Sequence, residues 1–249
     1  MIRTRRLTPA LLNAWLVDQE LDRRHPRYRL RLWREDTAAL AALLAELRLY
    51  TDEAFDDARR RLRRGFQDPL SPFIDPATDP AANYPALLHR VTLQGYFGET
   101  LAGIAVEHWG ALGHEDWCVP AFLFRLHDQE FQHLEQINQR LRDGAGHEPD
   151  ETAEQRPGRT GDDVLAFRMS AENVITAVMT LEAKCLSRNN NTKIEEAHRK
   201  LSDGGPLPSG VRELVNLLAE YETPEANTWL DALVRLRPNH YRTTRWHGC

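Results

Sequence analysis

Cysteine is scarce in this chain, because only three of its 249 residues are cysteines. Cys118, Cys185 and Cys249 are an odd number, and no Cys-x-x-Cys pair occurs among them. This usage argues against a disulfide framework and against a structural zinc site of the usual spacing. We therefore expect the three thiols to be reduced.

Long apolar runs are also lacking. The longest apolar stretches fall far short of the roughly 18 to 20 residues that a membrane-spanning helix needs. The first residues are rich in arginine and lead into an amphipathic segment rather than a uniformly apolar one. No internal repeat has a period typical of repeat proteins. We therefore expect a cytoplasmic protein that has no membrane partner.

The charge is unevenly distributed. A net charge of −5 argues against a protein whose whole surface binds a polyanion. Arginine is nevertheless concentrated in three stretches, at residues 23–34, 59–64 and 235–245. For any one of these stretches the simpler interpretation is a solvated helix face. Since the planar guanidinium matches phosphate oxygens, at least one stretch could instead contact phosphates.

The first part of the chain is expected to be helical. Within residues 1–66, Leu40, Leu43, Leu44 and Leu47 recur at i, i+3, i+4 and i+7. Residues 67–85 then contain five prolines, through which neither a helix nor a central strand can continue. We predict a domain boundary there, between a helical N-terminal region over 1–80 and a second domain over 81–249.

From residue 86 onward the pattern alternates between helices and strands, which is typical of an α/β core. The predicted elements are a helix at 96–105, a strand at 118–126, a helix at 130–142, an exposed loop at 144–161, strands at 163–169 and 174–185, a helix opened by a capping box at Thr192 and Glu195, and a final helix from about Ser209. The two later strands are separated by a short turn at 170–173, so we expect a hairpin.

The second hairpin strand ends in charged residues. Its apolar run is followed by Glu182-Ala183-Lys184, and a period of two places Glu182 and Lys184 on one face and Cys185 on the other, buried face. Charged side chains at the end of an apolar strand are unusual without a partner or a metal. A solvent-facing ion pair on an edge strand is the simpler alternative.

The spacing of the acidic residues adds a family resemblance. Asp163 is followed, after eighteen residues, by Glu182-Ala183-Lys184. This pattern resembles the active-site signature of the PD-(D/E)xK nuclease superfamily. The order of a Gly-Glu helix, Gly-x-Asp, Glu-x-Lys, a polar turn and a further helix is similar to nuclease effector subunits of bacterial anti-phage defence systems, such as the small effector of Hachiman. The resemblance covers about residues 95–221 and leaves 1–80 unmatched.

The resemblance implies an α/β fold with a restriction-endonuclease-like core, in which helices flank a central mixed sheet. It implies a Mg²⁺- or Mn²⁺-dependent DNA endonuclease with Asp163, Glu182 and Lys184 as its catalytic residues. Glu99, Asp163 and Glu182 would be the metal ligands, because hard cations prefer carboxylate oxygens. Lys184 would orient or deprotonate the attacking water and stabilise charge on the phosphate. Asp163 is preferred over Asp162 because it stands in the Gly-x-Asp register.

Defence nucleases of this kind usually act with a larger ATPase, helicase or sensor subunit, which is therefore the expected protein partner. Two other functions stay open. One is a non-catalytic subunit that binds a partner through its arginine-rich N-terminal helices, and the other is a restriction or repair endonuclease acting alone.

The sequence favours neither a zinc site nor a thiol nucleophile at Cys185. The possible zinc ligands have spacings that fit no common site; they are His108, His114, Cys118, His127 and His133.

Overall fold

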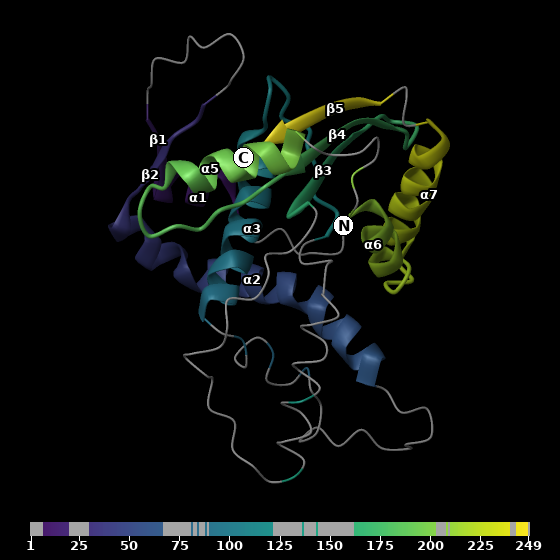
Figure 1. The fold of residues 1–249 in the computed structure, drawn as a ribbon, viewed down its shortest axis with the longest axis horizontal. Coiled ribbons are helices and arrows are strands. Elements are labelled where there is room, and N and C mark those ends of the chain that lie inside the picture. Colours follow the sequence, from purple (N-terminus) through teal and green to yellow (C-terminus); the bar gives the residue numbers. More distant parts are fainter. Residues whose placement is uncertain are drawn as a thin grey trace.

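The computed structural model describes residues 7–19, 30–66, 90–121, 162–202, 210–239 and 243–248, with single positions at 81, 84, 88, 136, 143 and 208. The elements are α1 (Pro9–Trp15), β1 (Leu16–Asp18), β2 (Trp33–Glu35), α2 (Thr37–Phe66), α3 (Arg90–Trp109), β3 (Val164–Met169), β4 (Ile175–Leu181), α5 (Asn191–Ser202), α6 (Val211–Leu218), α7 (Pro224–Asn239) and β5 (Thr244–Gly248) (Figure 1). The predicted helix at 130–142 and loop at 144–161 lie almost entirely outside the described residues, as does the predicted strand beyond residue 121.

The larger sheet is mixed. β3 and β4 form the predicted antiparallel hairpin, and β5 runs parallel to β4 along its other edge. The backbone of Cys118 pairs antiparallel with Phe167 of β3, with two N–H···O bonds of 2.9 Å. This bridge lies at the start of the predicted strand at 118–126. The α/β class expected from the sequence is therefore confirmed for the described residues.

Both faces of the hairpin are buried, and alternate residues of β3 meet different helices. Val164 and Ala166 belong to a core shared with α1, α2 and α3, whereas Leu165 and Phe167 belong to a core shared with α6 and α7. A strand covered on both sides must be apolar along its whole length. This explains why these strands appear in the sequence as continuous apolar runs. The sheet is thus a middle layer between two sets of helices.

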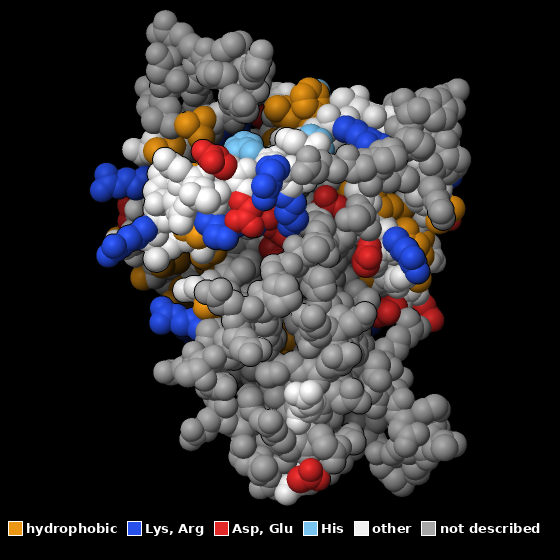
Figure 2. Space-filling view, viewed as in Figure 1, with side chains coloured by type: hydrophobic (Ala, Val, Ile, Leu, Met, Phe, Trp, Pro, Cys, Tyr) orange, Lys and Arg blue, Asp and Glu red, His pale blue; other side chains and the backbone are white. Residues whose placement is uncertain are grey.

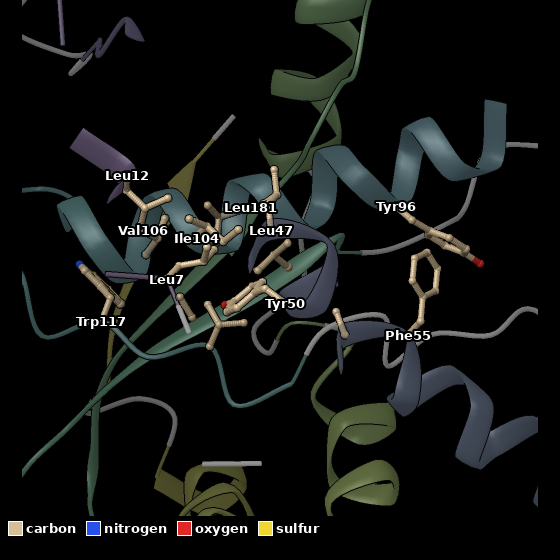
Figure 3. Close-up of a cluster of buried hydrophobic side chains, with 14 of the residues drawn as sticks. Leu7, Leu12, Leu47, Tyr50, Phe55, Tyr96, Ile104, Val106, Trp117 and Leu181 are labelled. Carbon is tan, nitrogen blue, oxygen red and sulfur yellow. The ribbon is translucent and has the colours of Figure 1, made fainter. Parts of the chain in front are cut away.

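The first core joins the N-terminal helices to the sheet. Its buried side chains come from α1, α2, α3, β4 and the segment after α3, and they include Leu12, Leu47, Tyr50, Ile104, Val106, Trp117 and Leu181 (Figure 3). Each fully buried aliphatic side chain of this kind contributes about 1.5–3 kcal/mol to folding. Large apolar residues lie near arginines in the N-terminal region, and they include Leu11, Trp15, Leu40, Leu44 and Leu47. Four of these five pack into or against this core. The fifth, Leu44, is 39 % exposed.

The prediction of continuous helix through the first 66 residues is wrong. β1 and β2 form a small antiparallel sheet between α1 and α2, with Leu16 opposite Glu35. The Trp15 indole donates a hydrogen bond to Glu35 Oε1 at 2.8 Å, which ties the end of α1 to the end of β2. Asp36 then caps α2, because its Oδ1 accepts the backbone N–H of Ala38 at 2.9 Å. The division at residue 80 falls next to residues that are not described and stays a prediction.

The C-terminal part contains more structure than the sequence predicts. The expected final helix corresponds to α6, and both α7 and β5 follow it. The predicted cap of α5 is also wrong by two residues, since Asn190 Oδ1 accepts the Lys193 N–H at 3.2 Å and Thr192 lies inside the helix. In the described part of the chain, no helix is both long and apolar enough to cross a membrane.

Candidate active site at the end of the hairpin

Backbone pairing places the two predicted carboxylates at the same end of the hairpin. Val164 is paired with Leu181, and the Asp163 N–H donates to the Leu181 carbonyl at 3.1 Å. Asp163 and Glu182 are therefore the next two residues outward on the two strands. Alternation along each strand turns both side chains away from α3, toward the face of the sheet that α6 and α7 cover.

Glu182 lies just beyond the end of β4, although the sequence predicts a strand to residue 185. Its position is still fixed by the sheet, because its N–H donates to the carbonyl of Gly248 on β5 at 3.0 Å. The strand ladder ends there, and the following residues have no assigned strand partner. Cys185 is exposed rather than buried, so the predicted alternation stops before it.

Asp163 and Asp162 have different surroundings. The Asp163 side chain is 9 % exposed, and its Oδ2 accepts the Ala183 N–H at 2.9 Å. Asp162 Oδ2 instead accepts the Gly210 N–H at 3.2 Å, at the beginning of α6. The structure thus brings Asp163, and not Asp162, next to Glu182 and the residues that follow it.

Two lysines hold the Glu182 carboxylate. The side chain of Glu182 is 1 % exposed, its Oε1 accepts a hydrogen bond from Lys184, and its Oε2 accepts one from Lys200. Lys200 also lies 3.5 Å from Asp163 Oδ1. A carboxylate buried to this degree needs such partners, because desolvation of an unpaired charge is costly. The group is therefore not a solvent-facing ion pair, and its four charges sum to zero.

Burial raises the pKa of the Glu182 carboxyl above its usual range, and the two lysines oppose this shift only in part. Burial acts in the opposite direction on Lys184, where it lowers the pKa, but the hydrogen bond to Glu182 and the neighbouring acidic charges outweigh it. The net result is a raised pKa for Lys184. This lysine is therefore an ammonium near neutral pH and cannot accept a proton in this state.

Lys200 is the residue of this group that the sequence analysis missed. It stands in the last turn of α5, eighteen residues after Glu182. The signal was present in the helical pattern, because position 200 shares one helix face with Ala197 and Leu201, the two buried residues of α5. A lysine on the buried side of a short amphipathic helix needs an acidic partner, and only the folded chain identifies it.

Glu99 is buried in α3, with 7 % of its surface exposed. The residue before it, Gly98, packs against the chain that follows Glu182: a β-carbon on Gly98 would lie 3.2 Å from Cys185 Cβ and 3.9 Å from Ala183 Cβ. Among the described residues, however, no group of three or more His, Cys, Asp or Glu side chains is arranged to hold a metal ion. The predicted three-carboxylate set is therefore not assembled as a metal site in this structure.

The two carboxylates by themselves fit a hard divalent cation. Asp163 and Glu182 already share one cation, the Lys200 ammonium, and carboxylate oxygens are the donors that Mg²⁺ and Mn²⁺ prefer. Acidic and basic side chains gather side by side near the middle of the view in Figure 2, in the area that α5 and β4 occupy in Figure 1. The arrangement can bind a cation between two strands and can present ammonium groups beside it.

Two of the arginine stretches have structural contacts. Arg31 donates to the carbonyl oxygen of Gly110 at 3.1 Å and joins the N-terminal segment to the end of α3. Arg59 pairs with Asp56 at 2.8 Å and donates to the Tyr84 carbonyl at 3.0 Å. These guanidinium groups stabilise local structure. Arg31 lies outside a helix and the Arg59 side chain is only 15 % exposed, so neither matches the solvated helix face of the simpler interpretation.

Comparisons of the chain with protein-family models, with curated proteins and with solved structures gave no match.

Proposed function

We propose that this protein is a metal-dependent DNA endonuclease of the PD-(D/E)xK type, with Asp163, Glu182 and Lys184 as its catalytic residues. One observation carries the proposal. Two acidic residues with eighteen residues between them in the sequence, Asp163 and Glu182, lie at one end of a buried hairpin, and Lys184 contacts the more deeply buried of them. Buried ionisable groups with perturbed pKa values are concentrated at functional sites, and carboxylates are the groups that hold a catalytic metal ion.

The order and direction of the strands support a restriction-endonuclease-like core. The chain runs from helix α3 to the bridge at Cys118, through the antiparallel pair β3 and β4, through α5, and finally to β5, which is parallel to β4. Strand pairing thus gives a mixed sheet with the acidic residues at the end of its central hairpin. A mixed sheet of this kind supports the core that the family resemblance implies.

The roles of the residues follow from their contacts. Asp163 and Glu182 would hold the metal ion, which supplies an activated water and neutralises charge on the phosphate. The Ala183 N–H orients the Asp163 carboxylate, and burial keeps water away from Glu182. Lys184 is an ammonium, so it donates hydrogen bonds to water or phosphate oxygens and does not act as the base. Glu99, buried next to Gly98, would complete the ligand set only after a rearrangement.

The biological setting of the proposal rests on the family resemblance. We propose a cytoplasmic effector of anti-phage defence that is held inactive by a larger ATPase, helicase or sensor subunit. The ion-paired carboxylates support such a resting state, because both oxygens of Glu182 are engaged by lysines of the same chain.

One observation favours a different function, that of a non-catalytic scaffold subunit. The four charged side chains neutralise one another without any metal, and a closed network of this kind can be purely structural. A scaffold would bind its partner through exposed residues of α2 such as Leu44 and Leu49. The scaffold function would not require a divalent cation to bind at Glu182.

Incubation of the purified protein with plasmid DNA separates the two functions. We expect nicking or linearisation with Mg²⁺ or Mn²⁺, no cleavage with a chelator, and poor replacement by Zn²⁺, which prefers nitrogen and sulfur ligands. The assay is run with and without the products of neighbouring genes, so that an inhibitory or activating subunit is detected. Equal cleavage in chelator, or none under any of these conditions, contradicts the proposed function.

A further inference from the structure

One cation already joins the two carboxylates of the site. The Lys200 ammonium is bonded to Glu182 Oε2 and lies 3.5 Å from Asp163 Oδ1, so it contacts oxygens from both strands. Lys184 differs, because its contact is with Oε1 of the glutamate two residues before it. A divalent ion shared by both carboxylates needs the oxygens that Lys200 now occupies. Lys200 and such an ion therefore compete.

The surroundings of Lys200 allow it to leave. Its side chain is 29 % exposed, and α5 is anchored by only two buried residues, Ala197 and Leu201. A lysine side chain is a flexible stem with a compact charge, so its ammonium can move several ångströms without moving the helix. Loss of the contacts with Asp163 and Glu182 therefore does not require α5 to unfold.

The net charge of the site becomes positive when the exchange takes place. Two carboxylates and two ammonium groups give a net charge of zero before a divalent ion binds, and +2 afterwards, with both lysines still beside the site. A phosphodiester carries one negative charge, and charged surfaces attract ligands of the opposite sign. A freed ammonium next to the ion is thus in position to bind a phosphate oxygen.

We propose that Lys200 is an exchangeable counter-ion, whose ammonium is displaced from Asp163 and Glu182 by a divalent cation and then binds the phosphodiester of the nucleic acid. The inference rests on the proposed function, since it takes these two carboxylates as the cation-binding pair. It adds an order to binding: the cation first, the nucleic acid second. Lys200 couples the two events.

The first experiment measures cation binding without nucleic acid or catalysis. Mn²⁺ is titrated into the wild type, Lys200→Met and Lys200→Gln, and free Mn²⁺ is followed by electron paramagnetic resonance. We expect both variants to bind Mn²⁺ about tenfold more tightly, because no ammonium has to be displaced. Lys193→Met is the matched control on α5, since Lys193 is exposed and pairs with Glu196, and its affinity should equal that of the wild type.

A second measurement uses the wild type alone, so that it does not depend on the folding of a variant. The purified protein is acetylated briefly with and without Mn²⁺, and labelled lysines are identified by mass spectrometry. We expect Mn²⁺ to increase the labelling of Lys200 several-fold and to leave Lys193 unchanged. Equal labelling of Lys200 in both conditions overturns the displacement.

The third measurement tests the phosphate contact. Binding of a labelled DNA duplex is compared with and without Ca²⁺, a cation that takes the same oxygen ligands. The wild type should bind more tightly with Ca²⁺, and Lys200→Met should lose about tenfold of that affinity, as expected for one charged phosphate contact. An affinity for DNA that Lys200→Met leaves unchanged overturns the coupling.

The outcomes separate this inference from the proposed function. If the wild type binds Mn²⁺ and cleaves DNA, but the Lys200 variants bind Mn²⁺ no more tightly, only the counter-ion role fails. If neither the wild type nor the variants bind Mn²⁺ at all, the cation site itself is absent and both fail.

Discussion

Gly98 and Cys185 are packed so closely that a β-carbon on Gly98 would have to displace its neighbour by a few tenths of an ångström. A β-carbon on Gly98 would lie 3.2 Å from Cys185 Cβ, which places α3 directly against the segment that carries Lys184. Gly95, one helical turn earlier, has nothing within 4 Å of such a β-carbon. The two glycines therefore give a matched pair of positions in one helix.

Gly98→Val is expected to disturb the site, because the added atoms push residues 183–185 away from α3. We expect a loss of about 1–3 kcal/mol in stability and a large fall in DNA cleavage. Gly95→Val has the same helix propensity but open space around it, and should change stability by less than about 1 kcal/mol. Thermal melts and plasmid cleavage are compared for both; identical behaviour of the two variants contradicts the packing argument.

Leu43 and Leu44 test whether α2 is part of the core or a free surface. Leu43 is 1 % exposed and Leu44 is 39 % exposed. Leu43→Ala should cost about 2–5 kcal/mol through lost burial and a residual cavity, whereas Leu44→Ala should stay within about 0.5 kcal/mol. Denaturant unfolding measures both free energies.

Removal of residues 1–66 is expected to give insoluble protein, because α1 and α2 share the first core with the sheet. A deletion variant that stays soluble and active contradicts this shared core.

Asp116 and Arg168 give a stability contribution that depends on pH. The Arg168 guanidinium donates to Asp116 Oδ1 at 2.6 Å, and this hydrogen bond holds the pKa of the carboxyl below its usual range. A depressed folded-state pKa stabilises the protein above the usual aspartate range, and the contribution is lost as pH falls from that range through the lower pKa of the folded state. Since the Asp116 side chain is 56 % exposed, the effect is at most about 1 kcal/mol.

The measurement compares the free energy of unfolding of the wild type and Asp116→Asn. The wild type should be slightly more stable near neutral pH, and the difference should vanish in acid and shrink in high salt. A difference that persists below the depressed pKa of Asp116 in the folded state means that the side chain acts through packing instead.

The hairpin could be predicted from the sequence because two apolar runs flank a short turn at residues 170–173, and the length of the turn limits the register of the pairing. Once Leu165 and Phe167 face one core and Val164 faces the other, the carboxylates just beyond the paired residues must meet at one end. Asp163 and Glu182 were therefore within reach of sequence reasoning. Glu99 was placed on the correct helix, but helical periodicity cannot tell how far a side chain in one element lies from a strand.

Other features depend on tertiary contacts that local patterns do not carry. β1 and β2 have three residues each, which is too short for a periodic signal, and they are held by the contact of Trp15 with Glu35. The pairing of Lys200 with Glu182 joins two elements, and its charge is an ordinary surface feature until the chain folds. The exposure of Cys185 results from the end of the ladder at Leu181, whereas the sequence alone continues the alternation.

The pairing of Glu182 with Lys184 and Lys200 also decides whether removal of the Glu182 carboxylate stabilises or destabilises the protein. Clustered carboxylates repel each other when they are alone, so their removal is expected to stabilise a metal-free site. Here two ammonium groups already neutralise the pair. Glu182→Ala would leave Lys184 and Lys200 facing each other, and we expect it to destabilise the protein. Glu182→Gln keeps the shape and is the better test of chemistry.

Cleavage of plasmid DNA by Glu182→Gln in Mg²⁺ tests most directly whether the carboxylates and Lys184 form a catalytic site. Lys184→Ala and Asp163→Asn are measured in the same assay, and the surface variant Lys193→Ala is the control. We expect the three site variants to lose at least about 100-fold in cleavage rate while their circular dichroism spectra match the wild type, and Lys193→Ala to cleave normally. Wild-type cleavage by folded Glu182→Gln would contradict the catalytic role of this carboxylate.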